Sequence, residues 1–155
     1  MAETPRTGVS LDVMLEDDPG LAAVQKRLRG LAGAELEELS SAIGEVLLSS
    51  TLERFRQQRG PDGKPWKKLK KPRPGGGSTI LVDKNQLRNS LHVAQSMIGI
   101  GTDAPHAATH QYGDFRRDKL GRKRNIPARP YVGITPDDVD EINALVTDYL
   151  GTVGT

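Results

Sequence analysis

One amphipathic pattern, from Glu35 to Gln58, is longer than any other in the chain and constrains the fold most. Its apolar residues recur at steps of three and four, which is the spacing of one face of an α-helix. The pattern predicts a single helix of about 35 Å, long enough to cross a small domain. A glutamate-rich start and an arginine-rich end suit the helix dipole, and the turn-forming Gly60–Gly63 stretch ends the pattern. The apolar positions are Leu36, Leu39, Ile43, Val46, Leu47, Leu52 and Phe55.

Shorter elements are predicted on both sides of this helix. An alternation of apolar and polar residues near the N-terminus has the period of a half-buried strand. Asp18-Pro19 and Thr135-Pro136 are each a capping residue followed by proline at the first helical position. The predicted elements are a strand over 9–15, helices over 19–30 and 136–149, and a loose tail over Gly151–Thr155.

The segment 80–132 holds most of the unusual residue choices and predicts a compact α+β block. Asp83 is placed to cap a short helix that carries Leu87 and Leu91. Ile98 and Ile100 alternate with glycines as residues of a strand do. A hairpin is therefore expected, with strands over Leu91–Val93 and Met97–Thr102 around a turn at Ala94–Ser96.

A second short helix is predicted from Ala104 to Tyr112. Pro105 suits a first helical turn, and Gly113 suits a helix end. After the basic segment 114–125, with a turn at Gly121, the two prolines of Ile126–Pro130 favour an extended chain. Tyr131 and Val132 then follow as a strand or as an anchor.

These elements predict an α+β fold in one domain spanning 1–155. The expected architecture is a small mixed or antiparallel sheet packed on one long helix plus shorter helices, with long basic loops over 60–78 and 114–125. A chain of 155 residues has the usual length of one domain. Only 35% of the residues are hydrophobic and 4% aromatic, so the core must be small. Contacts with partner subunits are expected to add stability.

Charge is unevenly distributed, although the net charge is only +2. Seven basic residues and one acid lie between Arg59 and Arg73, and six basic residues and one acid lie between Arg116 and Arg124. Acids gather at Glu16–Asp18, Glu35–Glu38 and Asp137–Glu141, an arrangement that suits contact between unlike ends of neighbouring copies. The glycine and charge content of Lys64–Ser78 and Asp114–Asn125 predicts loops that become ordered in an assembled particle. The candidate interaction residues there are Trp66, Lys67, Lys68, Lys70, Arg116, Arg117, Arg122, Lys123 and Arg124.

Arg129 and Tyr131 complete the candidate interaction residues. Prolines on either side of Arg129 stiffen the chain, so both side chains are held in one arrangement, as an interface or a core strut requires. Arg129 can pair bidentately with a carboxylate, for which Asp83, Asp103 and the acidic start of the last helix are candidates.

The composition excludes several classes of protein. Without cysteine there is no disulfide, thiolate nucleophile or cysteine-based metal site. No stretch approaches the roughly 20 apolar residues needed to span a bilayer, and the first ten residues lack the apolar core of a signal peptide. We therefore expect a soluble, unsecreted protein that does not contact membranes.

The histidines have two interpretations, a role in metal binding or catalysis and a role in packing. His106 and His110 are four residues apart, a spacing that can place two imidazoles on one metal, but no HExxH glutamate follows. A catalytic triad could be assembled from Ser90 or Thr109, a histidine and Asp103. The sequence around these residues shows neither a nucleophile elbow nor an oxyanion hole. Gly99-Ile100-Gly101 lacks the third glycine of a dinucleotide loop. We expect no catalytic residue, no metal and no cofactor.

Four ordered blocks resemble one known family. They are PDGKPWKKL at Pro61–Leu69, ILVDKNQLRNSL at Ile80–Leu91, IGIGTDAPHAATHQYG at Ile98–Gly113 and IPARPYVG at Ile126–Gly133. Together they resemble the phage virion morphogenesis family over roughly 36–149. One difference is Lys84-Asn85, where the family more often has Thr-Gly.

The resemblance implies a structural virion protein of a tailed bacteriophage, a tail-completion or neck protein that joins tail to head. It implies a homo-oligomeric ring, expected to be a hexamer, assembled in the host cytoplasm and placed at the head–tail junction. Head-completion and tail tube or terminator proteins would be its neighbours, with weak non-specific contact to passing DNA. The alternative is a nucleic-acid-binding protein that uses the two basic loops. A metal-dependent hydrolase built on His106 and His110 comes third.

Overall fold

The computed structural model describes residues 33–75, 77–94 and 98–153. The predicted strand over 9–15 and helix over 19–30 lie outside the described residues, as does most of the expected hairpin turn at Ala94–Ser96.

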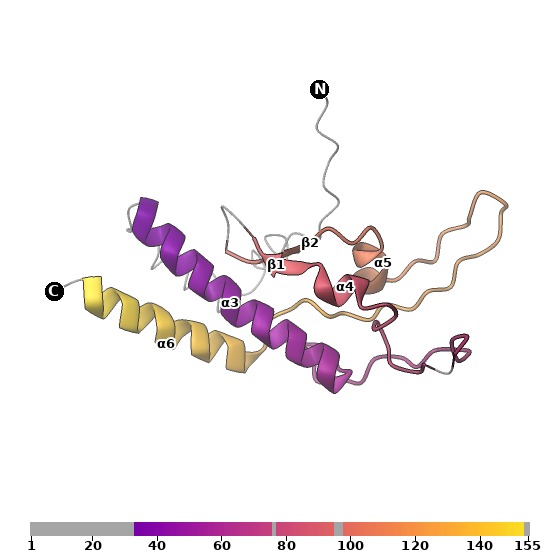
Figure 1. Cartoon of the computed structure of the whole chain (residues 1–155), viewed down its shortest axis with the longest axis horizontal. Helices are drawn as coiled ribbons and strands as arrows, with labels where there is room; N and C mark the ends of the chain where they lie inside the picture. Colours follow the sequence, from indigo (N-terminus) through magenta and orange to yellow (C-terminus); the bar gives the residue numbers. More distant parts are fainter. Residues whose placement is uncertain (1–32, 76, 95–97, 154–155) are drawn as a thin grey trace, which may run out of the picture.

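Two antiparallel helices pack against each other on one side of the molecule, α3 (Gly33–Gln57) and α6 (Pro136–Val153) (Figure 1). The predicted long helix is therefore confirmed to within two residues at each end. Its apolar stripe is buried in one core cluster together with the inner face of α6. The most buried residues of the two helices are Leu39, Ile43 and Leu47 of α3 and Ile142 and Val146 of α6. Full burial of each such side chain contributes about 1.5–3 kcal/mol.

The end of α3 is closed by Gln58, which takes a left-handed φ of 58°. The N–H of Arg59 donates to the carbonyl of Arg54 at 3.2 Å, which is the six-to-one bond of a Schellman motif. The Gln58 amide donates to the Ile80 carbonyl at 3.1 Å and accepts from the Ile80 N–H at 2.6 Å. The end of the helix is thus tied to the start of the central block.

The predicted hairpin is present as β1 (Leu91–Val93) and β2 (Ile100–Thr102), paired antiparallel. The second strand is shorter than expected, because it begins at Ile100 and leaves Ile98 outside the ladder. The hairpin lies directly on α3 at Gly44. A Cβ on Gly44 would overlap Cγ1 of Val93 and come within 3.2 Å of the Gly99 carbonyl, so only glycine permits this close approach.

The short helices of the central block differ from the prediction. The single turn α4 (Gln86–Asn89) begins after Asn85, which has a φ of 54° and makes no side-chain cap bond, so the predicted cap at Asp83 is wrong. Asparagine tolerates this left-handed conformation better than most residues. Leu91 lies in β1 instead of the helix. Helix α5 (Ala107–Tyr112) begins three residues later than predicted and ends at Gly113, as predicted.

The start of α6 is as predicted, whereas its end is not. Asp138 N–H donates to Thr135 Oγ1 at 3.1 Å, and Thr135 N–H donates to Asp138 Oδ2 at 2.8 Å, which makes a reciprocal capping box. The helix continues to Val153, so the loose tail predicted from Gly151 is wrong for its first three residues. Tyr149 and Leu150 still pack against the core, which keeps this last turn helical.

The α+β fold class is confirmed, with a small antiparallel sheet, one long helix and shorter helices. Across the described ranges, no helix is both long and apolar enough to cross a membrane.

Candidate functional site: the basic end of the molecule

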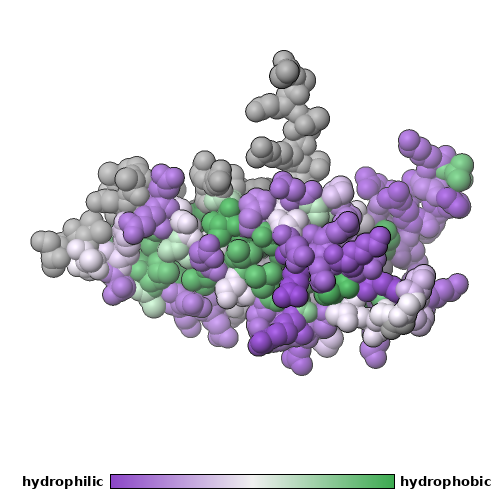
Figure 2. Space-filling view, viewed as in Figure 1, coloured by the Kyte–Doolittle hydropathy of each residue, from purple (hydrophilic) through white to green (hydrophobic). Residues whose placement is uncertain are grey.

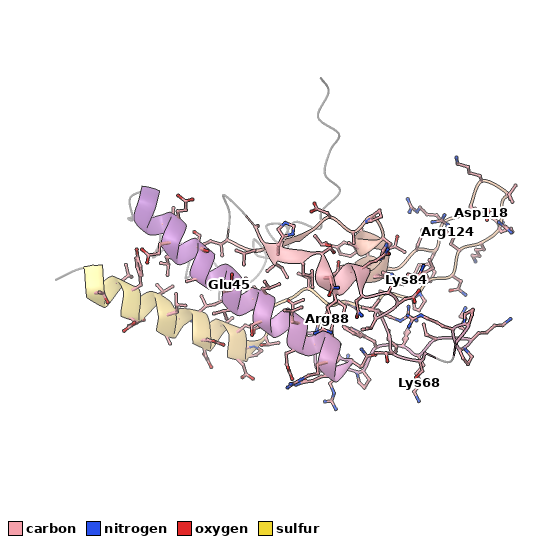
Figure 3. All side chains as sticks on the ribbon, viewed as in Figure 1. Glu45, Lys68, Lys84, Arg88, Asp118 and Arg124 are labelled. Atoms are coloured by element: carbon pink, nitrogen blue, oxygen red, sulfur yellow. The ribbon has the colours of Figure 1, made fainter. Side chains whose placement is uncertain are left out.

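Two basic segments project from one end of the molecule, opposite the end where α3 begins and α6 finishes (Figure 1). The first is 64–73 and the second, which we call the arm, is 114–126; together they form the basic end. Hydrophilic side chains predominate at this end in the surface view (Figure 2), and Lys68 and Arg124 lie on it, far from Glu45 of α3 (Figure 3). Most of the predicted interaction residues are therefore gathered at one place.

The arm is a paired ladder, which the sequence pattern did not predict. Asp114 and Ile126 exchange both backbone hydrogen bonds, at 2.9 and 3.0 Å, and the Arg124 N–H donates to the Arg116 carbonyl at 2.8 Å. At the tip, Gly121 has a φ of 75° and its N–H donates to the Asp118 carbonyl at 2.9 Å. This is the three-residue hairpin turn that ends in a left-handed glycine, and it fixes the direction of the arm.

Both carboxylates of the arm form ion pairs with arginines of the arm itself. Asp114 accepts from Arg116 Nε at 3.0 Å and from Arg124 Nη1 at 3.0 Å, and these hydrogen bonds, above all those from Arg116, hold the pKa of Asp114 well below its usual value. Asp118 accepts from the Arg122 N–H and from Arg122 Nε, each at 2.8 Å, and the backbone bond is the main cause of its lowered pKa. Six cations and two acids in the arm leave a surplus positive charge.

Trp66 and Tyr131 lie at the root of the basic end, not on its surface. Trp66 is 5% exposed and its Nε1 donates to the Pro130 carbonyl at 2.7 Å, while its ring stands edge-on to Phe55 at 5.4 Å. Tyr131 is fully buried and donates its hydroxyl to the Ala107 carbonyl at 3.3 Å, and burial raises its pKa. Both residues hold the basic end to the core. Any part that they play in assembly stays a prediction.

Arg129 is also buried, but the predicted carboxylate partner is wrong. Its Nε donates to the Lys67 carbonyl at 2.8 Å, and no carboxylate of the described ranges lies within ion-pair distance of it. Neither Asp83 nor Asp103 nor the start of α6 pairs with it. Burial, and then the charge of Arg73, lowers the pKa of Arg129. Its role in this structure is to fasten the backbone of the first basic segment.

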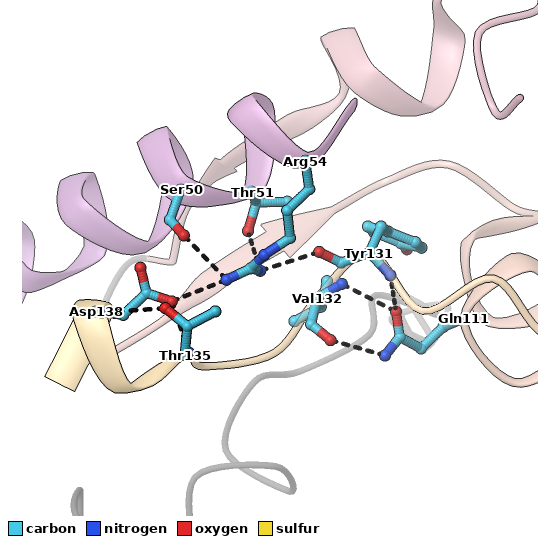
Figure 4. A network of polar contacts seen from close by, with 8 residues as sticks. All are labelled: Ser50, Thr51, Arg54, Gln111, Tyr131, Val132, Thr135 and Asp138. Carbon is cyan, nitrogen blue, oxygen red and sulfur yellow. Dashed lines mark hydrogen bonds and ion pairs between the residues drawn. The ribbon is translucent and has the colours of Figure 1, made fainter. Parts of the chain in front are cut away.

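The acidic start of α6 pairs with Arg54 instead (Figure 4). Arg54 Nη2 lies 2.8 Å from Asp138 Oδ2, and Nη1 donates to the Tyr131 carbonyl at 3.1 Å. Burial lowers the pKa of Arg54. Beside it, the Gln111 amide oxygen accepts from the N–H groups of Tyr131 and Val132 at 3.0 and 3.1 Å, and its nitrogen donates to the Val132 carbonyl at 2.9 Å.

Sequence reasoning missed Arg54, Gln111 and Asp138. One signal was available for Arg54, because it continues the apolar stripe of α3 at steps of four and three from Leu47 through Thr51. A polar residue on such a stripe is buried and needs a partner. The identity of the partner, 84 residues further along the chain, could not be read from the pattern.

His106 and His110 meet edge to face with ring centroids 5.2 Å apart. With Arg73 and Lys84 they line a pocket of about 270 Å³. Burial, followed by the charges of His106, Arg129 and Arg73, lowers the pKa of His110 to about 4. Within the described residues, no third histidine, aspartate or glutamate joins them to form a group that could hold a metal ion, so the metal hypothesis gains no support. Ser90 Oγ is paired with Thr102 Oγ1 at 2.6 Å.

Comparison with known proteins agrees with the resemblance of the four sequence blocks. The chain matches the model of the phage virion morphogenesis family over residues 17–151. It is 41% identical over 121 residues to the Mu-like prophage FluMu G protein 2 of Haemophilus influenzae, covering 76% of this chain and 80% of that protein. It is 27% identical over 136 residues to the Tail completion protein S of Escherichia phage P2, covering 79% and 89% of the two chains. No solved structure matches significantly.

The matched range contains α3, the central block, both basic segments and nearly all of α6. The buried network of Arg54, Gln111 and Asp138 also lies inside it. The protein therefore belongs to the phage virion morphogenesis family.

Proposed function

We propose that this protein completes the tail of a tailed bacteriophage and joins it to the head, as a homo-oligomeric ring at the head–tail junction. Family membership supports a role in virion assembly, and one relative bears the name of a tail completion protein. We further propose that the ring has six copies and assembles in the host cytoplasm. Its neighbours would be the head-completion protein on one side and the tail tube or terminator protein on the other. The role is structural and not enzymatic.

The observation that carries this proposal is the separation of charge along the molecule. Helix α6 carries four exposed carboxylates and no basic residue, whereas the basic end projects beyond the end of α3 (Figures 1 and 3). Unlike surfaces on one chain favour contact between the front of one copy and the back of the next. Contacts of this heterologous kind close into a ring when the rotation between copies allows it.

The proposal is tested by removing the protein from a producing prophage and examining the particles by electron microscopy. Filled heads and separate tails are expected, with joining restored when the protein is supplied from a plasmid. Immunogold labelling should place the protein at the junction in complete virions. Normal yields of joined, infectious particles in its absence would refute the proposal.

A second candidate function is nucleic-acid binding, favoured by the exposure of Lys67, Lys68 and Lys70. No described carboxylate lies within ion-pair distance of these lysines. Binding of the purified protein to duplex DNA would show it, with an affinity that falls steeply as salt rises. A triple change of these lysines to glutamine should then flatten the salt dependence. Absence of DNA binding at low salt would exclude this function.

A further inference from the structure

The two faces of the arm differ in how their charges are satisfied. Residues that alternate along a ladder point to opposite faces. The pairing of Asp114 with Ile126 and of Arg116 with Arg124 therefore places Asp114, Arg116 and Arg124 on one face, and this face carries the ion pairs of Asp114. Asp118 and Arg122 lie on the same face and pair with each other. This face is neutralised largely by its own residues.

The opposite face carries Phe115, Arg117 and Lys123, with Lys119 and Leu120 at the tip. Arg117 lies opposite Lys123 in the ladder, and Phe115 and Leu120 are 59% and 75% exposed. In the described structure none of the three cations has a carboxylate within ion-pair distance. We call this the open face of the arm. It combines positive charge that no described carboxylate neutralises with large exposed apolar side chains on a hydrogen-bonded ladder, in which Arg117 Nη1 also donates to the Gly121 carbonyl at 2.8 Å.

A complementary surface lies on α6. Asp137, Asp140, Glu141 and Asp148 are all exposed, and their spacing of three, four and eleven residues from Asp137 places them on one side of the helix. Ala144 lies in the middle of this acidic stripe. No basic residue of the described chain pairs with these four carboxylates, so their mutual repulsion is uncompensated within one copy.

We propose that the open face of the arm docks on the acidic stripe of α6 in a second copy of this chain. Three cations then face four carboxylates, and Leu120 and Phe115 gain apolar cover. The acidic stripe is long enough for the arm: Asp137 to Asp148 spans about 16 Å of helix, whereas Phe115 to Asp118 spans about 10 Å of strand, and the turn with Leu120 lies beyond it. Because the arm is already paired, little ordering entropy is lost on docking. This inference rests on the proposed function and names the contact that would build its ring.

The proposal is tested by charge reversal in the full chain. Arg117→Glu with Lys123→Glu reverses the arm, and Asp140→Lys with Glu141→Lys reverses the helix. Each pair alone should weaken self-association roughly tenfold or more, measured by sedimentation velocity over a range of concentrations. The quadruple variant, in which both surfaces are reversed, should recover association. Recovery of self-association is the decisive result, because a nonspecific effect of reduced positive charge on the arm would not be reversed by adding lysines on α6.

The matched control is Lys70→Glu with Lys71→Glu, which makes the same change of charge in the other basic segment. It should associate like the parent chain, and circular dichroism should show that every variant is folded. A parent chain that stays monomeric at all concentrations overturns this proposal. So does a quadruple variant that associates no better than either pair. An arm reversal that abolishes binding to a duplex oligonucleotide and leaves self-association intact overturns it in favour of a nucleic-acid contact.

Failure of this contact is distinguishable from failure of the proposed function. If the reversed variants associate normally and still restore joined particles to the deletion prophage, the ring uses another surface and the proposed function stands. If the parent chain is not found at the head–tail junction, the proposed function itself fails, whatever the arm contacts.

Discussion

Arg54 and Asp138, 84 residues apart in the sequence, form an ion pair of 2.8 Å between the last turns of α3 and the first turn of α6. Both side chains are almost completely buried, 7% and 6% exposed. Asp138 also caps its own helix through Thr135, and Arg54 also holds the Tyr131 carbonyl. One buried contact therefore sets where α6 begins, how it lies on α3, and where the root of the basic end is attached.

Arg54→Met should strongly destabilise the fold. The substitution leaves the Asp138 carboxylate buried without its cation, at a cost of about 3–5 kcal/mol in the free energy of unfolding. Urea unfolding followed by tryptophan fluorescence measures it. Arg56→Met is the control, because Arg56 pairs with Glu53 at the surface and should lose less than about 1 kcal/mol. Equal losses in the two variants would mean that the buried pair has no special role.

Gln111→Met should also destabilise the protein, for a different reason. Methionine has a similar size but leaves the N–H groups of Tyr131 and Val132 without the oxygen that accepts from both. A buried unsatisfied donor costs about 1–3 kcal/mol. The exposed Gln57→Met serves as control in the same urea titration. A variant as stable as the parent would show that another group or water replaces the amide.

Arg129→Lys should loosen the first basic segment, because lysine cannot reproduce the hydrogen bond from Nε to the Lys67 carbonyl. The expected loss is about 1 kcal/mol, with faster hydrogen exchange over residues 64–70. Arg88→Lys, on the exposed part of α4, is the control. Joint loss of melting temperature and particle yield supports a core strut, whereas lost yield at unchanged melting supports an interface. If neither the melting temperature nor the particle yield changes, Arg129 has neither the strut role nor the interface role.

Asp114→Asn should make the arm less sensitive to acid. The pKa of Asp114 is lowered in the folded state, so its stabilising effect is complete above its unfolded pKa, about 4, and is lost as the pH falls below that value. Hydrogen exchange of the arm amides at about pH 7 and about pH 3 measures this. The parent should lose protection on acidification, and the variant should be weakly protected at both values. Asp103→Asn is the control; a variant that retains the acid response of the parent contradicts the assignment.

His110 should make the whole domain less stable in mild acid. Its folded pKa is lowered to about 4, while the unfolded imidazole titrates near 6.5, so between these values the unfolded chain binds more protons. Stability should therefore fall as the pH drops from about 6.5 to about 4. In His110→Phe this part of the slope should disappear, whereas the exposed His92→Gln should retain it. An NMR titration that finds the His110 imidazole charged at neutral pH would contradict the prediction.

The sequence predicted which residues make up much of the candidate site, but it did not predict how they are arranged. The basic residues of the arm were identifiable because charge is read directly from the sequence. Their division into a self-paired face and an open face was not, because it depends on the register in which Asp114 meets Ile126. Trp66, Arg129 and Tyr131 were predicted as interaction residues, a role that stays a prediction. Their burial at the root of the basic end comes from contacts with distant segments, which the sequence pattern does not contain.

The sequence by itself determined the elements whose cause is local. The apolar spacing of α3, the Thr135-Pro136 start of α6 and the helix end at Gly113 each depend on residues within one or two turns, so their patterns were sufficient. Only the tertiary structure decided which carboxylate Arg54 meets, how far α6 extends, and how the arm pairs. Those outcomes depend on side chains brought together from far along the chain. Burial then makes the choice of partner decisive, because an unpaired polar group inside the core costs more free energy than any local preference supplies.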